Sequence, residues 1–370
     1  MPRPPIGRGF TRSCRVATPP PRGARFITMC LRLIAWTSCV LALSACKEVP
    51  QACRVIDDEL SHPLSFATYE DAGQSYDEWR ADLTAALLNA IGLPDELPEL
   101  KEPQLVGESR IDDIELLDYD IESWVDGVLI PYVVLIPARA KQQEARHVVI
   151  LLHGHGETAE APFQSESPMR NIGGRLLDEG YVVVSVELRS FGEFKVDGKA
   201  HDPYIAGLRD GEFIGQVVQD NIQVGEAVVN LFKDNPGSTI SIFGHSFGGY
   251  IALHVGALVD GISYSMSSGH FLPYACVNTE FAHHGQDILG MEGIAEIYDV
   301  TGMVAPLGNV DVFFGGRDTL FTPSSREAFK RLEAIYEKLG GPGKATLHVN
   351  PDIGHRVDPD AVIASLPKLP

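Results

Sequence analysis

The sequence has few cysteines and lacks long apolar runs and internal repeats. Beyond the first 45 residues, no run approaches the roughly 20 apolar residues of a membrane-spanning helix. The six cysteines show no metal-ligand spacing. The adjacent His283 and His284 would diverge on a helix or strand. We therefore predict one large or two ordinary globular domains with no metal site and no cofactor.

Acidic residues are absent from the first 45 positions, which carry seven arginines. The chain after residue 45 therefore carries the remaining 23 basic residues and all 50 acidic ones, a net charge of −27. Such an acidic surface repels phosphate backbones, so nucleic-acid binding is disfavoured. Solubility in an extracytoplasmic or saline setting accounts for this charge without a polyanionic partner.

The N-terminal region has the features of a secretory signal. Residues 1–28 are rich in Pro, Arg and Gly and show no periodicity, which predicts a disordered or untranslated segment with Met29 as the start. A short basic and apolar stretch over 29–45 follows, as in a signal peptide. It ends in Leu43-Ser-Ala-Cys46, which resembles a bacterial lipobox whose cysteine is lipidated after cleavage. An ordinary signal peptide with an incidental Cys46 is the alternative.

The lipobox resemblance implies a membrane anchor in the bacterial cell envelope. Lys47, rather than Asp, after the cysteine implies the outer membrane. Residues 46–75 are then predicted as a tether. If Cys46 is the anchor, Cys53 and Cys276 are the cysteines left in the mature chain, and their spacing neither requires nor excludes a disulfide.

The chain from residue 76 begins with a short helical segment and a hairpin. Apolar residues at helical spacing predict a helix over 76–91, followed by a Pro- and acid-rich connector up to residue 104. We predict strands over 111–121 and 128–136, joined near Asp126-Gly127. Residues 105–370 are predicted as the catalytic domain.

Buried strands alternate with helices from residue 147 onward, as expected for one α/β domain with a largely parallel central sheet, an N-terminal hairpin and helices on both faces. The polar, Gly-containing segment 192–213 is predicted to fold over the site as a lid. The predicted strands are 148–152, 181–186, 240–243, 263–267, 310–314 and 345–349, and the predicted helices are 169–179, 214–232, 324–339 and one beginning at 249.

The motif Gly244-His-Ser-Phe-Gly248 lies between a β-branched strand and a helical pattern. Gly-x-Ser-x-Gly in this context is typical of a nucleophile elbow, in which the serine stands on a sharp turn and the glycines allow strand and helix to pack closely. We predict Ser246 as the nucleophile. A Gly/Ser-rich turn without catalytic function is the alternative.

A serine nucleophile needs a base, and the base needs an acid to orient it. Asp318 follows the strand over 310–314, and His355 follows the strand over 345–349, in the order that this strand-and-helix arrangement requires. We predict His355 as the general base and Asp318 as its orienter. Asp311 and His348 lie within strands, and Asp352 would have to turn back on His355, so they are weaker candidates.

Two backbone N–H groups are needed to bind the oxyanion. One is predicted to be that of Phe247, directly after the nucleophile. The other is expected in the Gly-containing loop His153-Gly-His-Gly156, with His155 first and Gly156 next. The two histidines of this loop have no carboxylate partner nearby, so we do not predict a metal there.

These motifs together resemble the α/β-hydrolase superfamily over residues 110–365. Within it the chain is similar to the dienelactone-hydrolase and acetyl-xylan-esterase-like branch of bacterial esterases. This resemblance is carried by the His-Gly loop, Glu187-Leu-Arg-Ser-Phe-Gly192, Ala305-Pro306, the segment 315–323 and Gly354-His355. Glu187 and Ser190 depart from the usual Asp-x-Arg-Gly-x-Gly, and the phrase before the acid strand is less proline-rich than usual. Both loops border the pocket, so the catalytic residues carry over better than the substrate does.

The resemblance implies a lipid-anchored serine hydrolase that cleaves carboxylic esters of acetylated carbohydrates or other small acyl groups through an acyl-enzyme. Two other hypotheses stay open: a serine peptidase of the prolyl-oligopeptidase type, and a non-catalytic binding lipoprotein on a hydrolase scaffold. Residues 50–145 are too few for the propeller that such peptidases generally carry. We expect specificity to reside in the loops 187–213 and 270–305.

Overall fold

The computed structural model describes residues 62–143, 146–209, 211–235, 237–274, 276–277, 291 and 293–368. The predicted signal segment, Cys46, Cys53 and the pair His283-His284 lie outside these residues, so the predictions about them stay predictions. Within the described part, no helix combines the length and the apolarity needed to cross a bilayer.

One sheet of nine strands organises the described chain, in the order β1-β2-β3-β5-β4-β6-β7-β8-β9. The first three strands pair antiparallel, β3 joins β5 antiparallel, and β4 to β9 pair parallel. This confirms the predicted fold class. The strands are β1 (Gln104–Ile111), β2 (Ile114–Glu122), β3 (Leu129–Pro137), β4 (His147–Leu152), β5 (Val182–Val186), β6 (Thr239–His245), β7 (Ile262–Ser268), β8 (Asn309–Gly315) and β9 (Ala345–Asn350).

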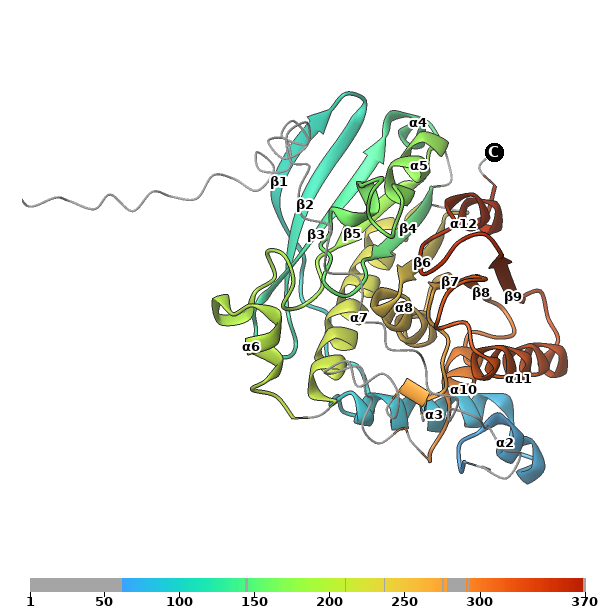
Figure 1. Cartoon of the computed structure of the whole chain (residues 1–370). Coiled ribbons are helices and arrows are strands. Elements are labelled where there is room, and N and C mark those ends of the chain that lie inside the picture. Colours follow the sequence, from blue (N-terminus) through green and yellow to red (C-terminus); the bar gives the residue numbers. More distant parts are fainter. Residues whose placement is uncertain are drawn as a thin grey trace, which may run out of the picture.

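Helices lie on both faces of the sheet (Figure 1). Alternate residues of the central strands enter two apolar cores, one on each face. Helices α2, α3, α7, α8, α10 and α11 contribute to one core, and α5 and α12 contribute to the other. The helices are α2 (Phe66–Ala72), α3 (Tyr76–Ala90), α4 (Ala138–Lys141), α5 (Ile172–Glu179), α6 (His201–Ile205), α7 (Glu212–Phe232), α8 (Phe247–Leu258), α10 (Ile297–Gly302), α11 (Pro323–Leu339) and α12 (Pro359–Ser365), with the short 3-10 turns η1 (Ala161–Phe163) and η2 (Val196–Gly198).

The sequence-based prediction missed one of the N-terminal strands. The predicted strand over 111–121 corresponds to β2, except that Ile111 ends β1 and a turn follows at Asp112, whose φ is 52°. The strand β1, which pairs with β2, was not predicted. The strand β1 lies at the edge of the sheet and none of its residues is buried, so it lacks the apolar alternation from which a strand is recognised.

The segment predicted as a tether also contains structure. Its residues 66–72 form α2, in which Phe66 is buried against the ring of Trp79 on α3. The Ser75–Glu78 capping box begins α3 at the predicted residue. The carboxylate of Asp299, on α10, accepts the backbone N–H groups of Phe66 and Glu296 at 2.9 Å each. The chain before residue 76 is therefore part of the packed domain from α2 onward.

The buried Asp299 predicts a pH-dependent stability. Burial raises its pKa to about 7, against the opposing effect of the two N–H groups, whereas an unfolded aspartate has a pKa of about 3.9. The native state then keeps a proton that the unfolded chain releases, so this contribution is full below the unfolded pKa and is lost as pH rises towards 7.

We expect the free energy of unfolding in urea to fall between pH 5 and pH 7 by up to about 2–3 kcal/mol through this group. The fall should be smaller in Asp299→Asn, which cannot titrate. An identical pH slope in the wild type and in Asp299→Asn would contradict this account of Asp299.

Candidate active site

Ser246 stands on a sharp turn between β6 and α8. Its φ is 53° and its ψ is −117°, in a region that non-glycine residues rarely adopt. Its N–H donates to the carbonyl of Ser268 at the end of β7, over 2.7 Å. The strand–serine–helix geometry is that of a nucleophile elbow.

The glycines on either side of Ser246 make this turn feasible. A Cβ at Gly244 would overlap the backbone of Gly248, and a Cβ at Gly248 would lie 2.5 Å from the carbonyl oxygen of His153. Strand β6, helix α8 and the end of β4 therefore approach one another more closely than any side chain allows. The sequence motif reflects backbone contact as well as flexibility.

Asp318 and His355 meet at the same edge of the sheet. His355 Nδ1 lies 2.9 Å from Asp318 Oδ2, and the second oxygen of Asp318 accepts the N–H of Leu320. The carboxylate is 1% exposed and the imidazole 32%. Because the carboxylate accepts from Nδ1, the Nε2 atom is the one that can exchange a proton with a substrate.

The His355 ring also lies next to the elbow. Its centroid is 4.7 Å from that of His245, the residue before Ser246. The contacts of the described residues include no hydrogen bond between the Ser246 hydroxyl and His355, and such bonds are often long in structures without substrate. The structure therefore brings all three predicted residues to one site, with the acid–base hydrogen bond formed.

The weaker candidates have other partners. His348 Nε2 lies 2.7 Å from Asp311 Oδ1, and the His348 ring stacks on Phe313 in mid-strand. Asp352 lies 3.7 Å from Arg317 on the surface. Neither carboxylate therefore serves His355.

The loop after β4 lies against the first turn of α8. Phe247 is the first residue of α8, so its N–H has no acceptor within the helix. The ring of His155 meets the ring of Phe247 edge to face at 6.2 Å. In this loop the N–H of Gly154 donates to Glu157 Oε2 and the N–H of Glu157 donates to Gly154, so neither amide competes with His155 for an oxyanion.

The electrostatics near Ser246 depend on buried groups that sequence reasoning gave no role. Burial raises the pKa of Glu157, against the effect of the Gly154 N–H and of the His153 and His355 charges. Burial, together with the charge of His355, lowers the pKa of His245 well below its usual value. His245 is therefore neutral at pH 7.

Sequence reasoning also missed a chain of side chains from the loop after β4 to the segment predicted as a lid. His155 Nε2 lies 2.9 Å from His201 Nε2 on α6, and His201 Nδ1 lies 2.7 Å from the Ser190 hydroxyl. The His201 ring stacks on Phe191 at 4.3 Å. No local motif predicts this contact, because His155 and His201 are 46 positions apart in the sequence and meet only in the folded chain.

Arg189, from the predicted pocket-bordering motif, is buried in an ion-pair network. Its guanidinium donates to Asp220 at 2.6 Å and to Asp126 at 2.7 Å, and the Ser123 hydroxyl donates to Asp220 at 2.6 Å. Because both carboxylates compensate its charge, we interpret Arg189 as fixing the loop after β5 to the β2–β3 turn and to α7.

A family model described as the alpha/beta hydrolase family matches residues 149–364. The structure is similar to a Bacteroides fragilis protein assigned as an acetyl xylan esterase, with a TM-score of 0.55, 15% identity and 77% of each chain covered. It is also similar to the glucuronoyl esterase from Solibacter usitatus, with a TM-score of 0.54, 14% identity, and 79% of this chain and 94% of that one covered. No curated protein has a significantly similar sequence. At these identities the structural likeness shows the fold alone.

Gly269, after β7, sets the position of His355. Its φ is 73°, and a Cβ there would lie 2.8 Å from Cε1 of His355. We expect Gly269→Ala to displace the imidazole and to slow the reaction of Ser246 with a fluorophosphonate by at least about 10-fold, because small misplacements of catalytic groups are costly.

Gly73→Ala is the matched control, because its φ is 68° and nothing lies within 4 Å of the added Cβ. Both variants carry the backbone strain of a left-handed alanine, about 1 kcal/mol, but only Gly269→Ala meets the imidazole. Equal labelling rates in the two variants would contradict the role of Gly269.

Proposed function

The chain belongs to the alpha/beta hydrolase family, and we propose that it is a serine esterase that hydrolyses carboxylic esters with Ser246, His355 and Asp318. The observation that carries this proposal is the strained turn at Ser246, which lies beside the Asp318–His355 hydrogen bond. A non-glycine residue in this conformation is costly and persists where the surrounding structure holds it for a purpose.

The proposed reaction proceeds through an acyl-enzyme. His355 Nε2 removes the proton of the Ser246 hydroxyl as its oxygen attacks the ester carbonyl. The N–H groups of Phe247 and His155 stabilise the resulting oxyanion, and the dipole of α8 adds to them. His355 then gives its proton to the leaving alcohol. Water, deprotonated by the same imidazole, cleaves the acyl-enzyme and releases the acid and Ser246.

Asp318 orients and stabilises the imidazole in this scheme. Its carboxylate is almost fully buried and accepts the hydrogen bond of the His355 Nδ1–H, so it fixes the tautomer with Nε2 free to act as a base. It also stabilises the imidazolium that forms after proton transfer.

The proposed substrates are esters of acetylated carbohydrates or other small acyl esters, in keeping with the branch of esterases that the sequence resembles. The similar structures include proteins whose names specify acetyl xylan and glucuronoyl esters, and these names describe those proteins. We propose a small acyl group without assigning the alcohol on this basis.

We further propose that the mature protein is anchored in the bacterial envelope by a lipidated Cys46, with the outer membrane as the membrane implied by Lys47. Cys276 is buried and disulfide-bonded, and disulfides persist in oxidising compartments such as the periplasm. This supports export of the chain. The sequence before residue 62, including Cys46 and Cys53, lies outside the described part.

The triad is tested by matched substitutions in the two Asp–His pairs. We expect Ser246→Ala to abolish hydrolysis of p-nitrophenyl acetate and Asp318→Asn to lower kcat by about 10³–10⁴-fold, because the amide stabilises the wrong tautomer. Asp311→Asn makes the same change in the pair with His348 and should leave kcat within about twofold.

Substantial activity in Ser246→Ala, or equal losses in Asp318→Asn and Asp311→Asn, would rule out this assignment. Faster cleavage of prolyl-peptide anilides than of any ester would favour a peptidase. A wild type as inert as Ser246→Ala on the p-nitrophenyl acyl series, but still able to bind a ligand, would favour a binding lipoprotein.

The anchor is tested by fractionating bacteria that express the full chain. We expect the wild type in the membrane fraction, with its maturation blocked by globomycin, and Cys46→Ser outside that fraction. Cys39→Ser, in the proposed signal segment, is the control and should remain anchored. Full anchoring of Cys46→Ser, or maturation in the presence of globomycin, would disprove the lipoprotein assignment.

A further inference from the structure

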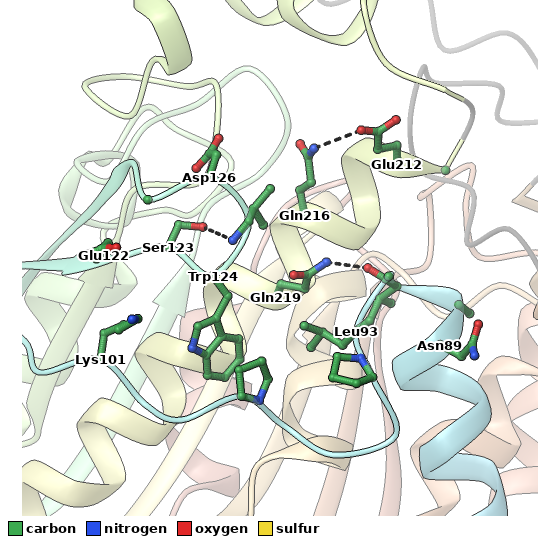
Figure 2. A pocket seen from close by; sticks show the side chains of 18 of the residues that line it. Asn89, Leu93, Lys101, Glu122, Ser123, Trp124, Asp126, Glu212, Gln216 and Gln219 are labelled. Carbon is green, nitrogen blue, oxygen red and sulfur yellow. Dashed lines mark hydrogen bonds between the residues drawn. The ribbon is translucent and has the colours of Figure 1, made fainter.

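A cavity of about 1020 Å³ lies between the end of α3, the β2–β3 turn and the start of α7. Figure 2 shows side chains from these three elements facing one another across it. The β2–β3 turn lies at the edge where β5 ends, because β3 pairs antiparallel with β5. The cavity, which we call the α3–α7 cavity, is therefore on the same edge of the sheet as Ser246, and its size is at the upper end of ligand pockets.

The walls of the α3–α7 cavity combine apolar residues with polar side chains and with charges of both signs. Lys101 and Arg209 are the lining cations, and Glu122, Asp126 and Glu212 are the lining acids. An apolar ligand would strip water from these groups without replacing their hydrogen bonds, which is unfavourable. Arg209 is already paired with Glu212 at 3.2 Å, so an anionic ligand would have to compete with that carboxylate for the cation. The lining therefore favours a ligand that is polar and uncharged.

The amide and aromatic side chains of the cavity narrow the ligand class further. Asn89, Gln216 and Gln219 line it, and an amide offers both donors and acceptors, as hydroxyl groups do. Trp124, on the β2–β3 turn, also lines the cavity (Figure 2) and provides a flat apolar face with a polar edge. A sugar ring presents the matching surface, with hydroxyl groups that can bond the amides and apolar C–H faces that can pack on the indole.

Several of these side chains are held in place before any ligand binds. Gln219 Nε2 donates to the carbonyl of Ile91 at 2.6 Å, and the indole N–H of Trp124 donates to the carbonyl of Glu99 at 3.0 Å. Gln216 accepts the hydroxyl of Tyr204 at 2.6 Å. A wall fixed by such bonds loses little conformational entropy when it binds a ligand.

The cavity and the elbow lie on two sides of the first turns of α7. Glu212 and Gln216 line the cavity, whereas Phe213 stacks parallel to Phe247 with 6.0 Å between ring centroids. A helix is about 10–12 Å across with its side chains, which a chain of a few sugar rings can span. Helix α6 contacts both the cavity and the loop after β4. Its Tyr204 donates a hydrogen bond to Gln216 in the cavity wall, and its His201 is hydrogen-bonded to His155.

From these observations we propose that the α3–α7 cavity binds a neutral oligosaccharide, and that it receives the alcohol part of an acetylated saccharide whose ester is presented to Ser246. The second half of this proposal rests on the proposed esterase function, whereas the first half does not. The ligand class follows from the lining, and its connection to the reaction follows from the position of α7.

Binding is measured first, without catalysis, by calorimetric titration of the Ser246→Ala protein with unacetylated xylotetraose, cellotetraose and mannotetraose. We expect at least one of them to bind, and Asn89→Ala and Trp124→Phe to weaken that binding about 10-fold each. Gln74→Ala is the control: Gln74 is an exposed amide just before the other end of α3, and the helix extends about 20 Å from Tyr76 to Asn89 at 1.5 Å per residue. It should bind as Ser246→Ala alone does.

Absence of binding by all three tetrasaccharides overturns the proposal, as does binding that Asn89→Ala and Trp124→Phe leave unchanged. Asn89 is exposed and its side chain makes no hydrogen bond with other described residues, so the fold of Asn89→Ala should persist. Circular dichroism of each variant checks this.

The link to the reaction is measured with two acetyl esters in otherwise wild-type protein. Asn89→Ala should raise KM about 10-fold for the acetylated form of the bound tetrasaccharide and leave kcat/KM for p-nitrophenyl acetate unchanged. Equal losses on both esters would overturn the assignment of the alcohol part. Saccharide binding by a wild type that hydrolyses neither ester would contradict the proposed esterase and would support the ligand class of the cavity.

Discussion

Backbone-to-backbone contact at residues 244–248 is the constraint on which the rest of the site depends. Strand β6 and helix α8 approach so closely that neither Gly244 nor Gly248 has room for a Cβ. This approach forces Ser246 into a positive φ and raises it above the sheet. It also brings the first turn of α8 against the end of β4, so that the Phe247 amide and the loop with His155 come together. The same close approach of β6 and α8 therefore positions both Ser246 and the proposed oxyanion donors.

The parallel sheet positions Asp318 and His355, which lie far from the elbow in the sequence. Strands β4 to β9 run in one direction, so the loops that follow them meet at one edge although they are far apart in the sequence. Asp318 and His355 are 37 positions apart and are hydrogen-bonded because they follow neighbouring strands. Gly269, after β7, leaves the space in which the imidazole lies. The bulk of the chain thus holds a few short loops at fixed distances.

The sequence predicts those parts of the molecule whose cause is local or follows a rule of chain order. The elbow could be recognised because its glycines have the required spacing and because an apolar strand precedes it and a helix follows it. Asp318 and His355 could be located because each directly follows a predicted strand. The edge strand β1 could not be predicted, because a strand without a buried face has no apolar period. The His155–His201 contact and the α3–α7 cavity also escaped prediction, because they depend on how distant segments pack.

The position of His355 after an edge strand makes its part of the site less stable to heating than the part around Ser246. His355 follows β9, the last strand of the sheet, which pairs only with β8 and has no buried residue, whereas Ser246 follows β6 in the middle. An edge strand can open locally at a lower free energy than the centre of the sheet, so His355 can leave its position while Ser246 stays in place. Warming should therefore move His355 away from Ser246 before the core of the sheet unfolds. Inactivation would then come from local unfolding around β9, and cooling would reverse it.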